Sequence, residues 1–160
     1  MDQIIFREDI KKEDIESVRD IIISTRFFRD DEIKIATELA EERIATGPAS
    51  GYHFLFAEIE GKVVAYCCYG LIPCSLVSYD IYWIATRAGL QGKGGGSLLL
   101  GKVESIISSL GGESVFLETS SKEMYEPTLR FYQRNGYTTE AILPDFYERG
   151  DGKVILRKRL

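Results

Sequence analysis

The stretch from Tyr79 to Gly101, YDIYWIATRAGLQGKGGGSLLLG, constrains the fold of this chain more than any other. Within it, Ile81 to Ala85 is a nearly unbroken apolar and aromatic run of strand length, typical of a strand buried on both faces. Glycines follow, and beyond them apolar residues recur at helical spacing, which predicts a helix that begins within the glycines. These periodic positions are Leu99, Val103, Ile106 and Leu110.

The order strand, glycine-rich loop, helix predicts a binding site for a phosphate or pyrophosphate. A helix N-terminus leaves backbone N–H groups without intrahelical partners, and the helix dipole adds partial positive charge there. Glycines at that point remove the side chains that would keep an anion away from the backbone. A flexible glycine linker is the competing interpretation, although a linker does not normally join a buried strand to an amphipathic helix.

Two familiar phosphate loops do not fit these glycines. A Walker A loop requires G-x-x-x-x-G-K-[ST], but Gly92-Lys93 is followed by Gly94, and the first glycine position holds Arg87. A Rossmann fingerprint requires G-x-G-x-x-G, and its last glycine position holds Ser97. A nucleotide-binding loop of either kind is therefore not predicted.

The pattern Q/R-x-x-G-x-G/A does fit, with Gln91, Gly94 and Gly96 at its defined positions. Set between the strand DIYWIAT and a leucine-rich helix, it resembles the acetyl-CoA pyrophosphate loop of the GNAT superfamily of N-acetyltransferases. The resemblance implies that backbone amides of the loop hold the pyrophosphate and that the preceding strand end pairs with the pantetheine arm. The cofactor-binding residues implied in this way are Ile84, Ala85, Thr86, Gln91, Gly92, Lys93, Gly94, Gly95, Gly96, Ser97, Tyr125 and Tyr132.

Periodicity and turn residues predict the order β-α-α-β-β-β-α-β-α-β-β, which is the GNAT order and covers nearly the whole chain. The fold class implied is α/β (α+β), a three-layer α-β-α fold with a mixed, mostly antiparallel twisted sheet. The sheet would splay between its central parallel strands, Val77–Ala85 and Ser114–Thr119. We expect a loop over Pro144–Gly152 between the last two strands, and one domain over residues 1–160, since 160 residues suit a single core.

Tyr132 is the first catalytic candidate. Acetyl transfer to an amine needs a neutral amine, a stabilised oxyanion and a proton for the departing thiolate. Tyr132 lies in TLRFYQRNGY, which resembles the GNAT motif whose tyrosine protonates that thiolate. Tyr125 and Leu129 share its helix face at i, i+4, i+7 spacing. A half-buried core aromatic is the alternative interpretation of Tyr132.

Glu118 is the leading candidate for the catalytic base, and Asp80 is the alternative. Glu118 follows the apolar run Val115–Leu117, where an unpaired buried carboxylate is costly and its pKa would be raised. Its position resembles the glutamate of the ribosomal-protein alanine N-acetyltransferase branch, although the segment SSKEMYEPT makes the chain longer here. A structural glutamate is the competing interpretation. Asp80 lies on the strand that opens the implied cleft.

Composition excludes several other classes. A net charge of −5 argues against general nucleic-acid binding. No apolar run approaches the ~20 residues of a membrane span, and MDQIIFRED does not resemble a signal peptide, so we expect a cytoplasmic protein. Adjacent Cys67 and Cys68 suit packing in a reduced setting, and His53, the single histidine, suits a structural role rather than a metal site.

The sequence therefore predicts an acetyl-CoA-dependent N-acetyltransferase acting by direct attack in a ternary complex on a small-molecule or peptide primary amine, without a metal. A non-catalytic acyl-CoA-binding or regulatory module is the alternative, and a kinase-like nucleotide binder lacks the Walker lysine–serine pair. By resemblance, the acidic helix that ends near Thr46 would form one wall of the acceptor site. An edge strand near the C-terminus offers a surface for a homodimer.

Overall fold

The computed structural model describes residues 3–160, which form two compact units. Unit 1 comprises the chain up to Gly70 together with Ile81–Ile106, and unit 2 comprises Leu71–Asp80 and Ile107–Leu160. The single domain expected over residues 1–160 stays a prediction.

The predicted order of elements is confirmed for residues 3–160, with two short 3₁₀ turns, η1 and η2, in addition. Hydrogen-bonded strands follow the order β1-β2-β3-β4-β5-β7-β6, which confirms the mixed, mostly antiparallel sheet. The elements are β1 (Ile5–Arg7), α1 (Asp14–Thr25), α2 (Asp30–Thr46), η1 (Gly47–Ser50), β2 (His53–Ile59), β3 (Lys62–Leu71), β4 (Ser78–Thr86), α3 (Gly95–Ser109), β5 (Ser114–Ser120), η2 (Glu123–Tyr125), α4 (Glu126–Arg134), β6 (Thr138–Glu148) and β7 (Asp151–Arg159).

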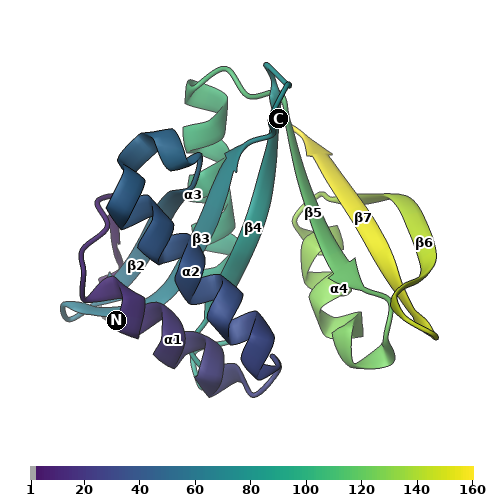
Figure 1. The fold of residues 1–160 in the computed structure, drawn as a ribbon, viewed down its shortest axis with the longest axis horizontal. Helices are drawn as coiled ribbons and strands as arrows, with labels where there is room; N and C mark the ends of the chain where they lie inside the picture. Colours follow the sequence, from purple (N-terminus) through teal and green to yellow (C-terminus); the bar gives the residue numbers. More distant parts are fainter. Residues whose placement is uncertain (1–2) are drawn as a thin grey trace. The chain divides into compact units, whose positions relative to one another are not determined.

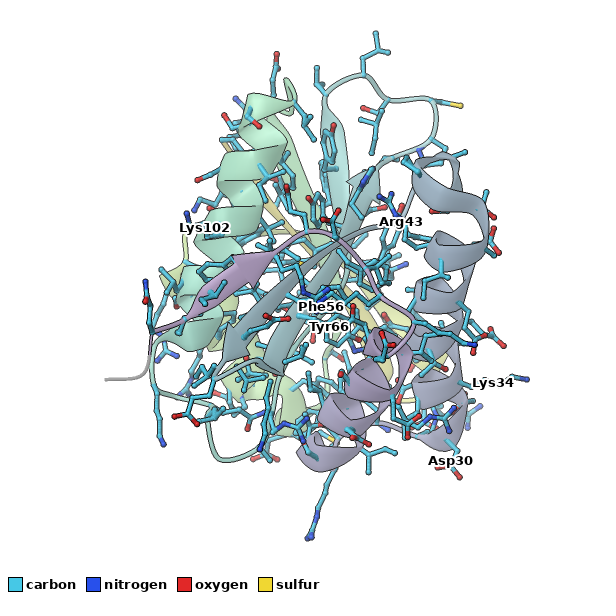
Figure 2. All side chains as sticks on the ribbon, turned by 90° about the vertical axis from the view of Figure 1, so that its left-hand side faces the viewer. Asp30, Lys34, Arg43, Phe56, Tyr66 and Lys102 are labelled. Atoms are coloured by element: carbon cyan, nitrogen blue, oxygen red, sulfur yellow. The ribbon has the colours of Figure 1, made fainter. Side chains whose placement is uncertain are left out.

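In unit 1, α1 and α2 cover one face of strands β2–β4, and α3 lies on the other face (Figure 1). Figure 2 shows Phe56 of β2 and Tyr66 of β3 together in the interior, whereas Lys34 of α2 points outward. The core arises because α1 presents an apolar stripe to the sheet. The buried residues of this core include Val18, Ile21, Ile22, Ala36, Ala40, Phe54, Phe56, Tyr66 and Cys68.

Asp30 and Asp31 are residue types that often cap a helix, but neither caps α2. Arg29 occupies the N-cap position, and its N–H donates a hydrogen bond to Glu32 Oε2 at 2.8 Å. Glu32, the third residue of the helix, thus accepts the hydrogen bond of the Arg29 N–H, and neither Asp30 nor Asp31 does so. Ile44, near the end of α2, is 39% exposed.

Helix α3 begins at Gly95, within the glycines as predicted, and the chain turns after it at Gly111, whose φ is +89°. Its fully buried residues are Leu99, Leu100, Val103 and Ile107. The expected stripe was therefore displaced by one residue in its second half, and Leu110 is 60% exposed. Leu110 lies beyond Ser109, the last residue of α3, so the helical repeat no longer governs where its side chain points.

In unit 2, the first residues of β4 pair in parallel with β5 over Ser78–Asp80 and Ser114–Phe116. Strand β5 pairs antiparallel with β7, which in turn pairs with β6. The loop expected over Pro144–Gly152 is wrong, because β6 continues to Glu148 and the hairpin closes between Glu148 and Asp151. Pro144 is tolerated since β6 is an edge strand with an irregular register there.

Candidate active site

The glycine loop of unit 1 leads directly from β4 into α3. Gly92 and Gly94 have φ values of +75° and +84°, a region that favours glycine. A Cβ built on Gly92, Gly94 or Gly95 would meet no atom within 4 Å, so the space beside this backbone is open. The loop therefore leaves room for an anionic group to lie directly against its main chain.

The start of α3 supplies backbone donors beside these glycines. Its first hydrogen bond runs from the Leu98 N–H to the Gly94 carbonyl oxygen, at 3.1 Å. The amides of Gly95, Gly96 and Ser97 therefore come before the first intrahelical bond. Such amides and the helix dipole attract an anion. Lys93, an exposed residue of the loop, adds a positive charge.

The loop is anchored to the end of β4 and to its neighbours. Gln91 Nε2 donates to the carbonyl oxygen of Thr86 at 3.2 Å. The Arg87 N–H donates to Val64 O of β3 at 2.8 Å, and the Ala88 N–H donates to Ser24 Oγ of α1 at 3.0 Å. Gln91, at the first position of the motif, thus ties the loop back to the strand.

The strand end assigned to pantetheine comprises Ile84, Ala85 and Thr86. In unit 1 the strands run β1-β2-β3-β4, so β4 is the last strand of that unit. The parallel register with β5 covers only Ser78–Asp80 of β4. Within unit 1, the backbone of Ile84–Thr86 thus lies at a strand edge, which is where an extended ligand can add hydrogen bonds.

Unit 2 contains a hollow of about 420 Å³ that brings both base candidates together. It is lined by Ile72, Ser75, Ser78, Asp80, Phe116, Glu118 and Ile155. Asp80 pairs with Phe116 across the parallel strands, and residues two apart on a strand point to the same face. Asp80 and Glu118 therefore share one face, although 37 sequence positions separate them.

Asp80 has the electrostatic setting that was expected for Glu118. Its carboxyl group is half-buried, and burial raises its pKa above the ordinary value of an aspartate. The negative charge of Glu118 raises the pKa further, whereas Lys153 lowers it. A carboxylate with a raised pKa beside a hollow is suited to accept a proton near neutral pH.

Glu118 differs from the expectation of a buried, unpaired carboxylate. Its side chain is 49% exposed, and Lys153 Nζ lies 2.9 Å from its Oε2. The reason is strand alternation: Val115, Leu117 and Thr119 are buried on one face, so Glu118 falls on the other. The role of Glu118 as base stays a prediction, but the burial argument for it was wrong.

Sequence patterns did not identify Lys153, near the start of β7, as a residue of this site. The signal that could have identified it is the pairing of β5 with β7, which sets Ser120 opposite Lys153 and Glu118 opposite Ile155. A diagonal reach then joins Lys153 to Glu118. Because single-strand patterns do not specify register, the pairing was not readable from the sequence.

Tyr132 lies in α4 of unit 2 and is 7% exposed. Its ring centroid is 5.3 Å from that of Phe131 and 5.9 Å from that of Tyr137. Tyr125 directly precedes α4, at its N-cap position. Both the catalytic role of Tyr132 and the cofactor contacts of the two tyrosines stay predictions, since a packed aromatic would have the same surroundings.

The remaining candidates have structural settings. His53 contacts Arg43, whose Nη1 lies 3.4 Å from its Nδ1, and burial followed by the charge of Arg43 lowers the His53 pKa. Cys67 and Cys68 are fully buried, and burial raises the pKa of both thiols, which disfavours a nucleophilic thiolate. Among residues 3–160, no group of three or more His, Cys, Asp or Glu side chains is placed to hold a metal ion.

A second hollow, of about 650 Å³, lies in unit 1 along the acidic helix α2. It is lined by Ile35, Glu38, Leu39, Glu41, Glu42, Ala45, Ser50 and Tyr52. Its place on α2 and the following η1 turn coincides with the expected wall of the acceptor site, and that role stays a prediction. None of the helices formed by residues 3–160 has the length and hydropathy of a membrane span.

Comparison with known families identifies the chain. The model of the acetyltransferase (GNAT) family matches residues 15–137. The chain therefore belongs to the acetyltransferase (GNAT) family, as its glycine loop predicted.

Individual relatives agree with this assignment. A solved structure from Desulfovibrio desulfuricans, described as a GNAT-family acetyltransferase, is 40% identical, covers 98% of this chain and 99% of its own, and has a TM-score of 0.96. An uncharacterized N-acetyltransferase of Methanocaldococcus jannaschii is 29% identical over 107 residues, which are 66% of this chain and 65% of that relative's length. An aminoglycoside 6'-N-acetyltransferase solved in complex with coenzyme A shares the fold, with 16% identity, 97% and 96% coverage and a TM-score of 0.75.

Proposed function

We propose that this protein is an acetyl-CoA-dependent N-acetyltransferase that acetylates a primary amine by direct attack in a ternary complex. The observation that carries the proposal is the hollow of unit 2, where the half-buried Asp80 has a raised pKa and faces Glu118. Membership of the acetyltransferase (GNAT) family supplies the reaction class. A half-buried carboxylate beside a hollow is suited to remove a proton from the ammonium form of an acceptor amine.

The backbone of the glycine loop supports the proposal that coenzyme A binds there. The open space beside Gly92 and Gly94, together with the amides of Gly95–Ser97, supports pyrophosphate binding there. The edge of β4 at Ile84–Thr86 supports pairing with the pantetheine arm. When bound, acetyl-CoA supplies the thioester carbonyl that an amine can attack. An aminoglycoside enzyme of the same fold was solved with coenzyme A, in agreement with this proposal.

In this proposal Asp80 is the general base. An acceptor amine is protonated near pH 7, so one N–H proton must leave before attack. Transfer of that proton to a carboxylate oxygen of Asp80 gives a neutral amine and a carboxylic acid. Glu118 is less suited because its charge is already matched by Lys153 at 2.9 Å. This choice revises the expectation that favoured Glu118, although both carboxylates remain testable.

Tyr132 is the proposed general acid. Its phenolic hydroxyl carries a proton at Oη that can pass to the departing thiolate. The family motif TLRFYQRNGY supports the role, and burial of Tyr132 to 7% exposure limits competition from water. The amine acceptor is proposed as cationic, since two carboxylates line the hollow.

Acetyl-CoA consumption with a panel of amines tests the proposal. The panel should include a peptide α-amine, a polyamine, an amino acid and an aminoglycoside, with thiol release as the measurement. Asp80→Asn should abolish the acid limb of the pH–rate profile, whereas Glu118→Gln should keep it. Retention of the limb in Asp80→Asn together with its loss in Glu118→Gln would reverse the assignment.

The alternative is a non-catalytic acyl-CoA-binding module. Such a module would use the same glycine loop but would need neither Asp80 nor Glu118. Calorimetry with coenzyme A, run beside the turnover assay, separates the two. Binding without turnover across the whole panel would favour the module, and absence of binding would contradict both proposals.

A further inference from the structure

The hairpin of β6 and β7 places an ammonium group beside the two carboxylates of the hollow. Lys153 Nζ lies 2.9 Å from Glu118 Oε2, across from the strand that carries Glu118. Ser120 is the residue directly opposite Lys153, so the side chain reaches back diagonally by two residues to make this pair. Lys153 and Glu118 are not opposite each other in the register, so the pair depends on the diagonal direction of the Lys153 side chain.

A second contact holds the same ammonium group in place. Lys153 Nζ lies 4.2 Å from the centroid of the Phe146 ring, which belongs to β6. The ring face attracts a cation, so the Lys153 ammonium has two favourable contacts, with Glu118 and with Phe146. The Lys153 side chain is only 15% exposed, whereas that of Glu118 is 49% exposed. Lys153 is thus the more buried member of the pair.

We propose that Lys153 is a positioning residue: it engages Glu118 as its counter-ion, so that Asp80 is the carboxylate left to take the proton of the acceptor amine. This inference rests on the proposed function, because it assigns a role within the same site. Lys153 acts through Glu118 and Asp80 and does not itself react. The protonated acceptor amine gives its N–H proton to Asp80, and Lys153 and Glu118 keep their charges.

The charges around Asp80 support this division of roles. Glu118 of β5 and Lys153 of β7 are the charged groups that influence Asp80, and they act in opposite directions. Arg157, also on β7, is held by Glu140 at 2.8 Å and stands 6.0 Å from the Phe116 ring. The segment before β4 contributes Ile72 and Ser75, both neutral, to the hollow. Removing the Lys153 charge therefore leaves Glu118 uncompensated beside Asp80.

Carboxyl ¹³C NMR titration tests the inference without a substrate. Lys153→Met keeps the length of the side chain and removes its charge, so the midpoint of Asp80 should move to higher pH. Lys153→Arg keeps the charge and should restore a midpoint close to that of the wild type. Asp80→Asn and Glu118→Gln assign the two resonances.

Lys122→Met is the matched control. Lys122 pairs with Glu148 near the same hairpin, and its side chain is 41% exposed. The substitution removes one positive charge from the same hairpin region but none from the hollow, so the Asp80 midpoint should stay where it is. An equal shift in Lys122→Met and Lys153→Met would overturn the inference, since the effect would then be one of net charge. An unmoved midpoint in Lys153→Met would also overturn it.

A kinetic measurement separates this inference from the proposed function. In an active enzyme, Lys153→Met should move the acid limb of the kcat/KM profile to higher pH and lower kcat/KM several-fold on the acid side. A merely structural ion pair would lower stability without moving that limb. If the wild type acetylates no amine but the Asp80 midpoint moves in Lys153→Met, the proposed function fails and the charge assignment to Lys153 stands.

Discussion

Replacement of single glycines in the loop can separate backbone strain from ligand contact. Gly92 and Gly94 both have φ in the left-handed region, +75° and +84°, and a Cβ on either would meet no atom within 4 Å. Alanine in that region costs about 1–2 kcal/mol. Gly92→Ala and Gly94→Ala should therefore lower the free energy of unfolding by similar amounts, measured by urea denaturation.

Coenzyme A affinity should distinguish the two variants. Gly94 is a defined position of the motif and immediately precedes the free amides of α3, whereas Gly92 occupies a position where the motif accepts any residue. Disturbing one hydrogen bond to a charged phosphate costs about 1.5–3 kcal/mol. The Kd for coenzyme A should then rise about ten- to a hundredfold in Gly94→Ala, and much less in Gly92→Ala.

Gly101→Ala provides the control within the same helix. Gly101 lies inside α3, and a Cβ there meets no atom within 4 Å, so the substitution should stabilise the protein by about 0.5–1 kcal/mol. Calorimetry should find its coenzyme A affinity unchanged. Wild-type affinity in a folded Gly94→Ala variant would refute the reasoning, as would an equal loss in Gly92→Ala, because strain alone would then explain the data.

Three further predictions concern unit 2. Tyr132→Phe should lower kcat strongly and leave coenzyme A affinity nearly intact in calorimetry, and unchanged turnover would remove Tyr132 from the mechanism. Gly112→Ala should destabilise the protein by about 1–3 kcal/mol in urea, because its Cβ would stand 2.3 Å from Ile107 Cγ2 and 2.9 Å from Tyr79 Cδ2; wild-type stability would contradict the packing. Because the raised pKa of Asp80 makes the folded state bind its proton more tightly, stability should fall as pH rises from the unfolded to the folded pKa. Asp80→Asn should therefore gain stability relative to the wild type as pH rises above the ordinary pKa of an aspartate, and a pH-independent difference would count against a buried Asp80.

Local signals made much of the fold predictable. The glycine run predicted the start of α3 within the residues where it occurs, because glycines before an amphipathic repeat combine a loop and a helix N-terminus. Glu60-Gly61 is a local turn signal at the hairpin of β2 and β3, and both residues have positive φ, as a tight two-residue turn requires. These features depend on residues close in sequence, which is why they could be read without a structure.

The errors arose where a pattern depends on strand pairing. Pro144 and the glycines near it indicated a loop, yet an edge strand tolerates a proline because its outer N–H groups need no partner. Glu118 was taken as buried because its neighbours are apolar, although alternate residues of a strand face opposite sides. The pair of Lys153 with Glu118 depends on register between β5 and β7, and no single segment encodes that register.

The two compact units carry different kinds of chemistry, and this difference decides how the proposals can fail. In unit 1 the features that suit coenzyme A are main-chain groups, the amides of Gly95–Ser97 and the strand edge at Ile84–Thr86. Substitutions elsewhere leave such groups in place, so a chain can lose turnover and still bind the ligand. In unit 2 the features that suit proton transfer are side chains, and one substitution removes each of them. Binding alone therefore cannot distinguish an enzyme from a binding module. A pH-dependent rate that responds to substitution of both Asp80 and Lys153 can do so. A binding module has no need of Asp80 at a raised pKa beside Glu118 paired with Lys153.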